Sequence, residues 1–440
     1  MARTAANIPA GLRLADHITL GVLTTQFPRE LVEQVLFETE RVSERERDLP
    51  AHVMVYFAIA LALYPDVATR EVLRCLVEGA RWLGDPARPR IPTKSGISQA
   101  RSRLGATPLE ALYRAVVAPV AVEGTPGAWY RGWRVMSLDG TTLDVSDTPE
   151  NTRAFGRPGS GRGVNATGAF PQLRLVALVE NGTHALCGAQ LGDSRTHEVR
   201  LAAAVVPTLT GEMLCLADRG FLGYDLFQQA SATGAALVWR AKVIQQLPVL
   251  EQFPDGSYRS ELRWNSHCQS PERTPIPVRV VAYTLPGMVD AAVVYRLVTN
   301  ILDAARAPAV DLARLYHERW EIETAFDEFK THLRGGQRVL RSKTSALVQQ
   351  EAWGFLLAHF ALRALMHEAA LGALPRARDP DTMSFVHVVR VTRRTLSHLA
   401  AIPPSGPTAL ARRTPARTAR GDRELQPRAL RAARRQTQDE

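Results

Sequence analysis

The chain has few cysteines for its length, four among 440 residues, and none of them forms a C-x-x-C pair. This wide spacing argues against a zinc ribbon and against a disulfide framework, and it is typical of a reducing cytoplasm. The eleven histidines form no H-x-x-x-H or H-E-x-x-H pattern. The longest apolar run, residues 53–64, is too short to span a bilayer. We therefore expect a cytoplasmic protein that does not enter a membrane.

Acidic residues are outnumbered by basic ones, 44 against 54, which gives a formal net charge of +10. A positive balance of this size is compatible with a polyanionic partner, of which nucleic acid is the most common. Hydrophobic residues make up 45% of the chain. A chain of this length and composition can bury at least one large core and divide into two or three domains.

Two aspartates stand where buried strands are expected to end. Residues 133–138 form a largely apolar run without a helical period, and the run stops at Asp139, followed by Gly140. Residues 213–217 repeat this arrangement before Asp218. The pattern predicts two buried strands, each with a carboxylate at its C-terminal tip. Each aspartate taken alone has an ordinary explanation as the residue that opens a turn.

A third carboxylate lies in a charged segment between residues 316 and 330, which we call the signature segment. In a continuous helix, Tyr316, Arg319, Glu323 and Lys330 would fall within roughly 60° of one another on the helical wheel. A carboxylate between two cations suits a site that holds metal and phosphate together. An exposed, salt-bridged helix is the alternative interpretation.

These motifs resemble those of a known family. The spacing Y-x2-R-x3-E-x6-K from Tyr316 to Lys330 resembles the Tyr-Arg-Glu-Lys signature of the insertion sequence 4 family of DDE transposases. D-G-T at Asp139 and A-D-R-G-F around Asp218 resemble the two aspartate motifs of that family. The resemblance extends from about residue 25 to about residue 370.

The resemblance implies roles for individual residues. It makes Asp139, Asp218 and Glu323 the catalytic carboxylates and the ligands of two Mg²⁺ ions, with Mn²⁺ as an alternative. Three carboxylates and the phosphate oxygens of a substrate are a donor set that suits these ions. The other signature residues, by the same resemblance, contact the transposon end: Tyr316, Arg319 and Lys330.

The implied activity is the cut-and-paste movement of an insertion sequence. The family hydrolyses a phosphodiester at each element end, passes through a hairpin and transfers the freed strand to target DNA. The expected partners are double-stranded DNA, as terminal inverted repeats and as target, and a second copy of the chain in a synaptic homodimer at the bacterial nucleoid. The alternatives are a stand-alone nuclease of the same fold and an inactive or domesticated repressor that only occupies the repeats.

The expected fold class is α/β, an RNase H-like core with a β-rich insertion, preceded by an N-terminal helical bundle. We expect an N-terminal helical DNA-binding domain at 1–125, the first part of the core at 126–242 and the insertion at 243–306. The second part of the core follows at 307–372, and a basic helix and flexible tail at 373–440. Within this plan we expect separate strands at 133–138 and 141–145, a helix at 108–122, and a tight turn at Asn181-Gly182.

Two further regions carry predicted DNA contacts. Residues 92–104 begin with Pro-Thr and resemble the recognition helix of a helix-turn-helix, while an ordinary basic surface helix is the alternative. In the insertion, the family supplies an aromatic that stacks on a flipped base. The matching strand here carries Tyr295 in place of a tryptophan, and cross-strand packing is the alternative role. The predicted contacts of the recognition helix with the terminal repeat are Lys94, Gln99, Arg101 and Arg103.

Overall fold

The computed structural model describes residues 23, 25–43, 49–80, 92–158, 170–264, 273–284, 294–336, 338–371 and 379–395. The predicted C-terminal tail beyond residue 395 lies outside the described residues. The chain divides into two compact units. Unit 1 comprises Met1–Val120, Leu143–Leu173 and Phe326–Arg417; unit 2 comprises Ala121–Thr142, Arg174–Ala325 and Thr418–Glu440.

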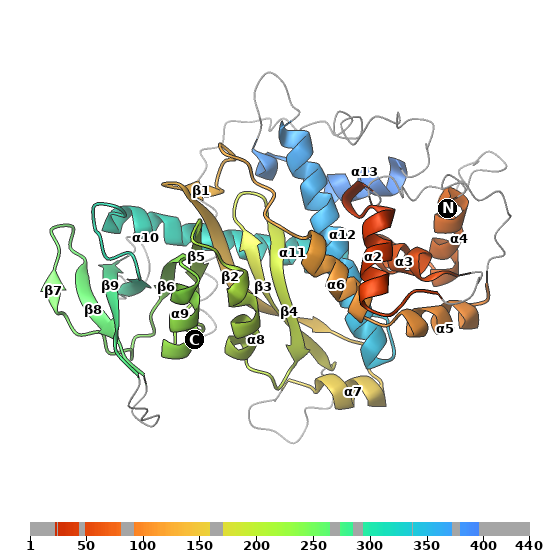
Figure 1. The fold of residues 1–440 in the computed structure, drawn as a ribbon, viewed down its shortest axis with the longest axis horizontal. Helices are drawn as coiled ribbons and strands as arrows, with labels where there is room; N and C mark the ends of the chain where they lie inside the picture. The colour runs from red at the N-terminus through yellow and green to blue at the C-terminus, as the bar shows by residue number, and fades with distance from the viewer. Residues whose placement is uncertain are drawn as a thin grey trace, which may run out of the picture. The chain divides into compact units, whose positions relative to one another are not determined.

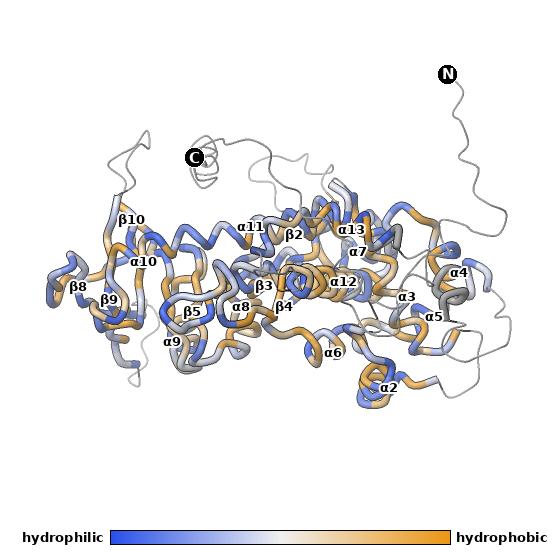
Figure 2. The backbone as a smooth tube through the Cα atoms, turned by 90° about the horizontal axis from the view of Figure 1, so that it is seen from above, coloured by the Kyte–Doolittle hydropathy of each residue, from blue (hydrophilic) through white to orange (hydrophobic). Residues whose placement is uncertain are grey.

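Unit 1 is built mainly from helices (Figure 1). Its central element is α12, a helix of 27 residues at Ser345–Leu371 that is buried along most of its length, and Figure 2 shows it mostly in hydrophobic colours. The helices of the unit, in chain order, are α2 (Arg29–Glu38), α3 (Ala51–Leu63), α4 (Thr69–Ala80), α5 (Lys94–Leu104), α6 (Thr107–Val116), α7 (Pro149–Phe155), η5 (Glu328–Leu333), α12, η6 (Pro380–Thr382) and α13 (Phe385–Thr395).

The packing of α12 against α3 requires a glycine. The residues of α3 are apolar on every side and ten of its thirteen are buried, which is typical of a helix in the middle of a core. A Cβ added at Gly354 of α12 would lie 2.6 Å from the carbonyl oxygen of Ala58. The absence of a side chain at Gly354 therefore allows the two backbones to approach closely.

Unit 2 contains most of a ten-stranded sheet with the order β4-β3-β2-β5-β6-β10-β9-β8-β7, to which β1 (Trp129–Tyr130) adds beside β2. Strands β2 and β5 are parallel, as are β5 and β6. The order of the first five strands confirms the predicted RNase H-like core. These strands are β2 (Trp133–Asp144), β3 (Gln172–Glu180), β4 (Ala185–Asp193), β5 (Met213–Ala217) and β6 (Ala236–Arg240).

Two details of the predicted elements were wrong. The strands expected at 133–138 and 141–145 are one continuous strand, β2, because residues 139–142 stay extended despite their polar character. The helix expected at 108–122 stops at Val116, and Val117 is already extended. Pro119 lies three residues beyond this end and could not continue the helix.

The insertion continues the sheet of the core. Strand β10 (Tyr295–Thr299) pairs antiparallel with β6 of the core and with β9 (Ile276–Tyr283). β8 (Tyr258–Leu262) and β7 (Glu251–Gln252) complete this edge (Figure 1). The described residues of the insertion are thus rich in strands, as predicted.

Each face of the sheet in unit 2 carries its own apolar core. One core includes Met136 and Leu138 with residues of α8 (Glu198–Val205), η3 (Val206–Thr208) and α9 (Tyr224–Ala232). The other includes Val135, Leu214 and Leu216 with residues of α10 (Ala309–His317). Because side chains alternate along a strand, Asp139 and Asp218 are directed toward the face that α10 covers. Among the described residues, no helix is both long and apolar enough to cross a membrane.

Candidate active site

The first two carboxylates meet at one edge of the sheet. Leu138 of β2 is in register with Ala217 of the parallel strand β5, so Asp139 and Asp218 follow at equivalent positions on neighbouring strands. Each carboxylate accepts a hydrogen bond from the next backbone N–H, at 2.8 Å for Asp139 and 2.6 Å for Asp218. The predicted placement of Asp218 directly after a buried strand is confirmed, whereas Asp139 lies within β2, which continues to Asp144.

Arg319 joins the third carboxylate to this edge. Its guanidinium is buried and lies with Nη1 3.1 Å from Asp139 Oδ2 and Nη2 3.6 Å from Glu323 Oε1. Among the described residues, none accepts a hydrogen bond from Arg319 Nε. One arginine therefore bridges the acid of β2 and the acid of the signature segment.

The charges of the three acids influence one another. Burial raises the pKa of Asp139, Arg319 opposes this rise, and the neighbouring Asp218 adds to it. Burial also raises the pKa of Glu323 to about 7, again against Arg319 and with contributions from Asp139 and Asp218. Like charges gathered in a partly dry site have this effect. Carboxylates with raised pKa values that lie close together are typical of a functional site. Such a site is suited to bind a cation.

Tyr316 packs against the end of β5, next to Asp218. Its side chain is buried in the core between α10 and the sheet, and its hydroxyl donates to the carbonyl oxygen of Ala217 at 3.4 Å. Burial raises its pKa above the ordinary tyrosine value, so the phenol stays protonated at neutral pH. The contact of Tyr316 with the transposon end stays a prediction, while its packing beside Asp218 is observed.

The signature segment is not a single regular helix, contrary to the prediction. α10 ends at His317, a 3-10 turn η4 covers Glu318–Trp320, α11 covers Glu321–Asp327, and η5 is a π-helix over Glu328–Leu333. Changes of helical type alter the rotation per residue, so positions on one helical wheel do not apply over the whole segment. Such π-turns occur frequently at functional sites.

Lys330 lies in the π-helix and belongs to unit 1, whereas Tyr316, Arg319 and Glu323 belong to unit 2. Burial and the charge of Arg334 lower the pKa of Lys330, and Asp144 and Asp327 oppose this shift. The π-helix is fixed in unit 1 by Glu328, whose carboxylate accepts a 2.8 Å hydrogen bond from Nε of buried Arg363. The phosphate contact predicted for Lys330 stays a prediction.

Two models of known protein families match the chain. The model for the transposase DDE domain matches residues 131–361, and the model for the insertion element 4 transposase N-terminal region matches residues 17–114. The chain belongs to the insertion sequence 4 family of DDE transposases. The catalytic role of Asp139, Asp218 and Glu323 stays a prediction.

Relatives of the transposase include a curated protein of Escherichia coli K12, the transposase InsG for insertion sequence element IS4. It is 28% identical over 382 residues, covering 85% of this chain and 82% of the relative. A second protein of the same strain, InsZ, is 26% identical over 231 residues, covering 52% of this chain and 71% of the relative. Among solved structures, a cryo-EM structure of a piggyBac transposase synaptic complex with hairpin DNA matches this chain with a TM-score of 0.45 and 12% sequence identity. The match covers 92% of this chain and 86% of the other chain. This similarity is too low to support an argument.

Tyr295 of the transposase takes part in a row of aromatic contacts. Its ring stacks on Tyr283 with 5.5 Å between centroids, and the guanidinium of Arg240 lies 4.5 Å from its centroid. Tyr283 in turn meets His317 of α10 edge to face. Cross-strand packing, the alternative role for Tyr295, is therefore present. Its stacking on a flipped base stays a prediction.

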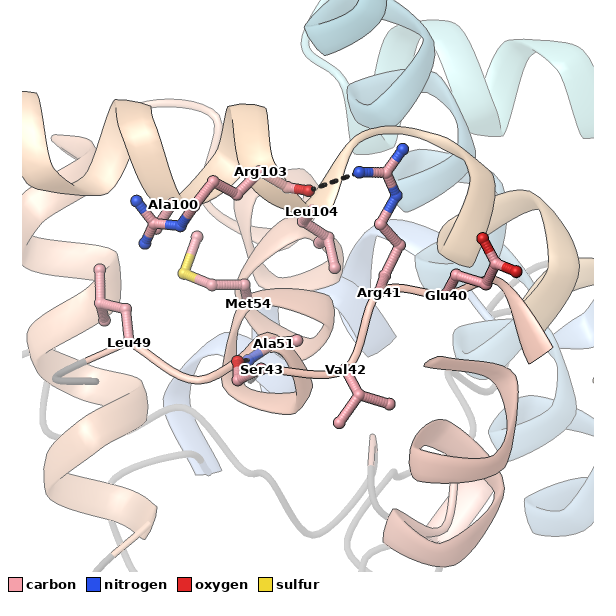
Figure 3. Close-up of a pocket in the computed structure, with 10 residues that line it drawn as sticks. All are labelled: Glu40, Arg41, Val42, Ser43, Leu49, Ala51, Met54, Ala100, Arg103 and Leu104. Atoms are coloured by element: carbon pink, nitrogen blue, oxygen red, sulfur yellow. Dashed lines mark hydrogen bonds between the residues drawn. The ribbon is translucent and has the colours of Figure 1, made fainter. Parts of the chain in front are cut away.

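The helix α5 begins where the sequence predicts, since the side chain of Thr93 accepts a hydrogen bond from the backbone of Gly96. Lys94, Gln99 and Arg103 are exposed on it and stay candidates for DNA contact. Arg103 also lines a pocket with Arg41, whose Nη1 lies 3.4 Å from the Arg103 carbonyl oxygen (Figure 3).

Arg101 of α5 does not fit the predicted role. Its side chain is only 7% exposed, and its Nε donates to Gln350 Oε1 of α12 at 2.9 Å. Nη2 donates to the hydroxyl of Ser342 at 3.1 Å. These bonds occupy the guanidinium inside unit 1, so the prediction that Arg101 touches the terminal repeat was wrong: the side chain stabilises the unit itself.

Several residues of the centre were missed from the sequence. Glu198, the first residue of α8, lies against the backbone after Asp139, since a Cβ on Gly140 would be 2.9 Å from its Oε1. Asn181 and Glu321 connect the signature segment to the β3–β4 turn. An amide or a carboxylate in a polar turn gives no periodic signal. The only local signals were two glycines, Gly140 after Asp139 and Gly182 after Asn181. Each lies where another part of the chain comes close to the backbone.

Proposed function

We propose that this transposase cuts and rejoins DNA at a divalent cation site formed by Asp139, Asp218 and Glu323. The observation that carries the proposal is the convergence of these acids around Arg319 in one compact unit. Their donors are carboxylate oxygens, the ligands that Mg²⁺ and Mn²⁺ prefer. Burial, with a smaller contribution from neighbouring carboxylates, raises the pKa values of Asp139 and Glu323, and a bound divalent cation would oppose this rise. The residues therefore fit the ion.

A pair of bound Mg²⁺ ions would supply Lewis-acid stabilisation of the attacking and leaving oxygens in an in-line phosphoryl transfer. The residues of the chain do the rest. Asp139, Asp218 and Glu323 hold the site in place. Arg319 compensates part of their charge before DNA arrives, and we propose that its guanidinium also contacts the transposon end.

The substrate we propose is duplex DNA that ends in the terminal inverted repeats of an insertion sequence. Water attacks one phosphodiester and frees a 3′-hydroxyl. This hydroxyl attacks the phosphodiester of the opposite strand, which forms a hairpin and releases the flanking DNA. A second water opens the hairpin, and the end then attacks target DNA. Each step makes one phosphorus–oxygen bond and breaks another. Two ends must be joined, so we propose a homodimer in the synaptic complex, acting at the nucleoid in the bacterial cytoplasm.

The test is cleavage of a labelled duplex that carries the repeats flanking this gene, with Mg²⁺ and then with EDTA. We expect nicking at the element boundary with Mg²⁺ alone, and a loss of about 10³-fold or more in Glu323→Gln. Glu318→Gln is the matched control, because Glu318 is an exposed acid of the same segment. Nicking by Glu323→Gln at the rate of the wild type would overturn the assignment of the site.

The same assay separates transposition from simple cleavage. A transposase joins the freed 3′ end to a second plasmid, and this product requires both element ends in one complex. Release of cut DNA with no joined product, at protein concentrations that pair the ends, would identify a nuclease instead. Binding of the repeats with no nicking at all would identify a repressor.

A further inference from the structure

The turn between β3 and β4 is buried although its residues are polar. Asn181 is 0% exposed, Thr183 1% and His184 4%. We propose that Asn181 is a positioning residue that holds the signature segment in register with the strand bearing Asp139, and so sets the separation of the carboxylates. This inference rests on the proposed metal-dependent cleavage.

The Asn181 amide forms one hydrogen bond on each side. The hydroxyl of Ser137 donates to Asn181 Oδ1 at 2.8 Å, and Asn181 Nδ2 donates to the carbonyl oxygen of Glu318 at 2.9 Å. Ser137 precedes Asp139 by two residues on the same face of β2. Glu318 directly precedes Arg319. The amide therefore connects the neighbours of two residues that face each other across the centre.

The bond to Glu318 stands at a break in the helix. η4 covers Glu318–Trp320, between the end of α10 and the start of α11. The Glu318 carbonyl accepts from the backbone N–H of Glu321 within this turn, and Asn181 adds a second donor from outside the segment. A carbonyl oxygen has two lone pairs, so it can accept both bonds. A primary amide suits this place because it accepts and donates at once, whereas a carboxylate offers no proton to the Glu318 carbonyl.

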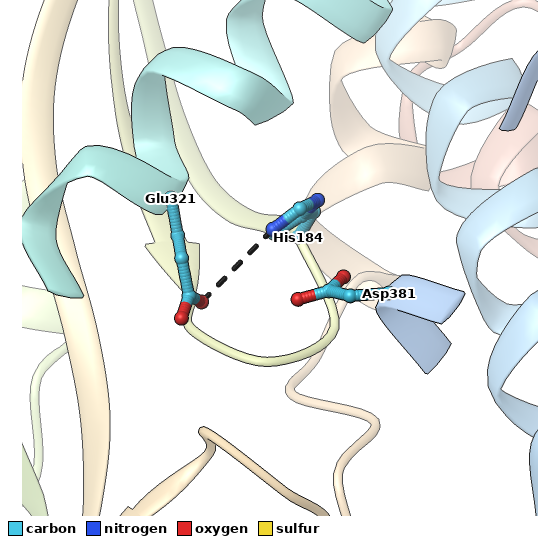
Figure 4. A group of neighbouring side chains, drawn as sticks. All are labelled: His184, Glu321 and Asp381. Carbon is cyan, nitrogen blue, oxygen red and sulfur yellow. Dashed lines mark ion pairs between the residues drawn. The ribbon is translucent and has the colours of Figure 1, made fainter. Parts of the chain in front are cut away.

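A second bond from the turn reaches the next residues of the segment. The backbone N–H of Gly182 donates to the carboxylate of Glu321, the first residue of α11, and His184 Nε2 lies 4.0 Å from the same carboxylate (Figure 4). Gly182 has a φ of +76°, and a Cβ there would lie 2.8 Å from the Ala128 backbone nitrogen. The turn is thus fixed between residues 126–128 and the segment.

All these groups belong to unit 2, as do the three carboxylates. Asn181 contacts neither an acid of the triad nor Arg319 in any hydrogen bond of the described structure, so its effect must pass through Glu318 and β2. Removal of a group that hydrogen-bonds a metal ligand costs about 10- to 100-fold in metal affinity or activity, and Asn181 acts one residue further away, so we expect an effect at the lower end of this range. A purely structural residue would lower stability and leave the affinity of the folded protein for metal unchanged.

The experiment measures Mn²⁺ binding to the full-length protein by electron paramagnetic resonance, beside the Mg²⁺ concentration for half-maximal cleavage of an element end. Asn181→Asp keeps the shape of the side chain and removes its donor. We expect a weakening of Mn²⁺ binding of about ten-fold, a matching shift of the Mg²⁺ midpoint, and unchanged affinity for the element end. Ser137→Ala, which removes only the bond to Oδ1, should shift both values in the same direction by less, and it serves if Asn181→Asp does not fold.

Thr183→Ala is the matched control. Its hydroxyl donates to Glu180 within the same turn at 2.6 Å, so the variant disturbs the turn without breaking its bonds to the segment. We expect lower thermal stability and wild-type metal values. Asn181→Asp and Ser137→Ala with wild-type metal values, or a Thr183→Ala shift as large as theirs, would overturn the positioning role. A wild-type protein that binds no Mn²⁺ and does not cut would overturn the proposed function itself, and the positioning role with it.

Discussion

Glu323 is the residue whose ionisation is most closely connected to the state of the site. Burial disfavours its charged form most, Arg319 opposes this effect, and the like charges of Asp139 and Asp218 add to it. In the folded protein without a cation, the proton on Glu323 is held more tightly than in the unfolded chain. Ionised Glu323 therefore destabilises the folded protein above neutral pH, and a bound divalent cation would remove this destabilisation.

A pH series on Glu323→Gln should reveal this cost. The pKa rises from 4.5 in the unfolded chain to about 7 in the folded protein, so the folded state binds more protons and stability falls as pH rises through that window. In EDTA, we expect the melting temperature of the wild type to fall relative to Glu323→Gln between pH 4.5 and 7, with Mg²⁺ reversing the difference. Glu318→Gln should follow the wild type. Parallel melting curves for wild type and Glu323→Gln at every pH would contradict the raised pKa.

Arg101 is a buried cation whose hydrogen bonds stabilise the fold of unit 1. Arg101→Ala would leave Gln350 Oε1 unpaired in the interior of unit 1, so we expect a loss of about 2–4 kcal/mol in the free energy of unfolding. Arg103→Ala, two residues further along α5 and exposed, should change it by less than about 0.5 kcal/mol. Denaturant melts of both variants provide the comparison, and equal midpoints would argue against the structural role of Arg101.

At the scale of elements, α10 is held at both ends by bonds from distant parts of unit 2. Its C-terminal end meets Asn181 of the β3–β4 turn. Its first residue, Ala309, donates its backbone N–H at 2.9 Å to Asp255, in the turn between β7 and β8. Asp255 also accepts from Arg279 at 2.6 Å. The insertion thus caps the helix that leads to the proposed catalytic centre.

The Asp255 cap should be visible in the pH dependence of stability. Partial burial acts to raise the pKa of Asp255, but the bonds from Ser257 and Ala309 and the charge of Arg279 outweigh it, so the pKa is lowered from 3.8. The stability that Asp255 contributes is present above pH 3.8 and is lost as pH falls through the lower folded value. Asp255→Asn should cost about 1–3 kcal/mol at pH 7 and less below pH 3.8.

Thermal or denaturant melts at both pH values measure this difference, with Glu251→Gln as the control because Glu251 is exposed in neighbouring β7. A difference between Asp255→Asn and wild type that stays constant down to pH 2 would show that the ionised carboxylate does not carry the effect.

The sequence predicted the elements that have strong local signals. Apolar runs that stop at Asp139 and Asp218 predicted two buried strands, and their parallel pairing brings the two acids together, although β2 continues past Asp139 to Asp144. The signature segment was predicted as one helix because its periodicity is helical throughout. Its 3-10 and π turns accompany tertiary bonds such as that of Asn181 to Glu318. No pattern within fifteen residues contains that information.

The burial of Arg101 was missed for a related reason. Gln350, its partner, is 249 residues away in sequence, and a basic residue on a short polar helix is exposed in most proteins. Conversely, Thr93 could be predicted as a helix cap because its partner Gly96 is three residues away. Local partners are readable from sequence, while partners that meet only in the folded unit are not.

At the scale of the whole molecule, the two units carry different parts of the proposed function. Unit 2 contains all three carboxylates, so its own fold is sufficient to assemble them. Unit 1 contains α5 and Lys330. With a net charge of +10, the chain is suited to bind DNA mainly through phosphate contacts, whose strength depends on salt.

The salt dependence of DNA binding tests whether α5 contacts the terminal repeat. We expect Lys94→Ala and Arg103→Ala each to weaken binding to the terminal repeat and to reduce the slope of log affinity against log salt by about 1. Arg114→Ala in α6 is the control, since its guanidinium is paired with Glu110 at 2.7 Å. Fluorescence anisotropy with a labelled repeat, from about 50 to 200 mM salt, gives the slopes. Unchanged slopes in both α5 variants would leave the helix without a role in DNA binding.

The most direct measurement for the central claim is an anomalous difference map from crystals of the protein with element-end DNA and Mn²⁺. The account predicts peaks at coordinating distance from the carboxylates of Asp139, Asp218 and Glu323, and loss of a peak in Glu323→Gln. Mn²⁺ bound only elsewhere on a protein that has engaged its DNA would contradict it.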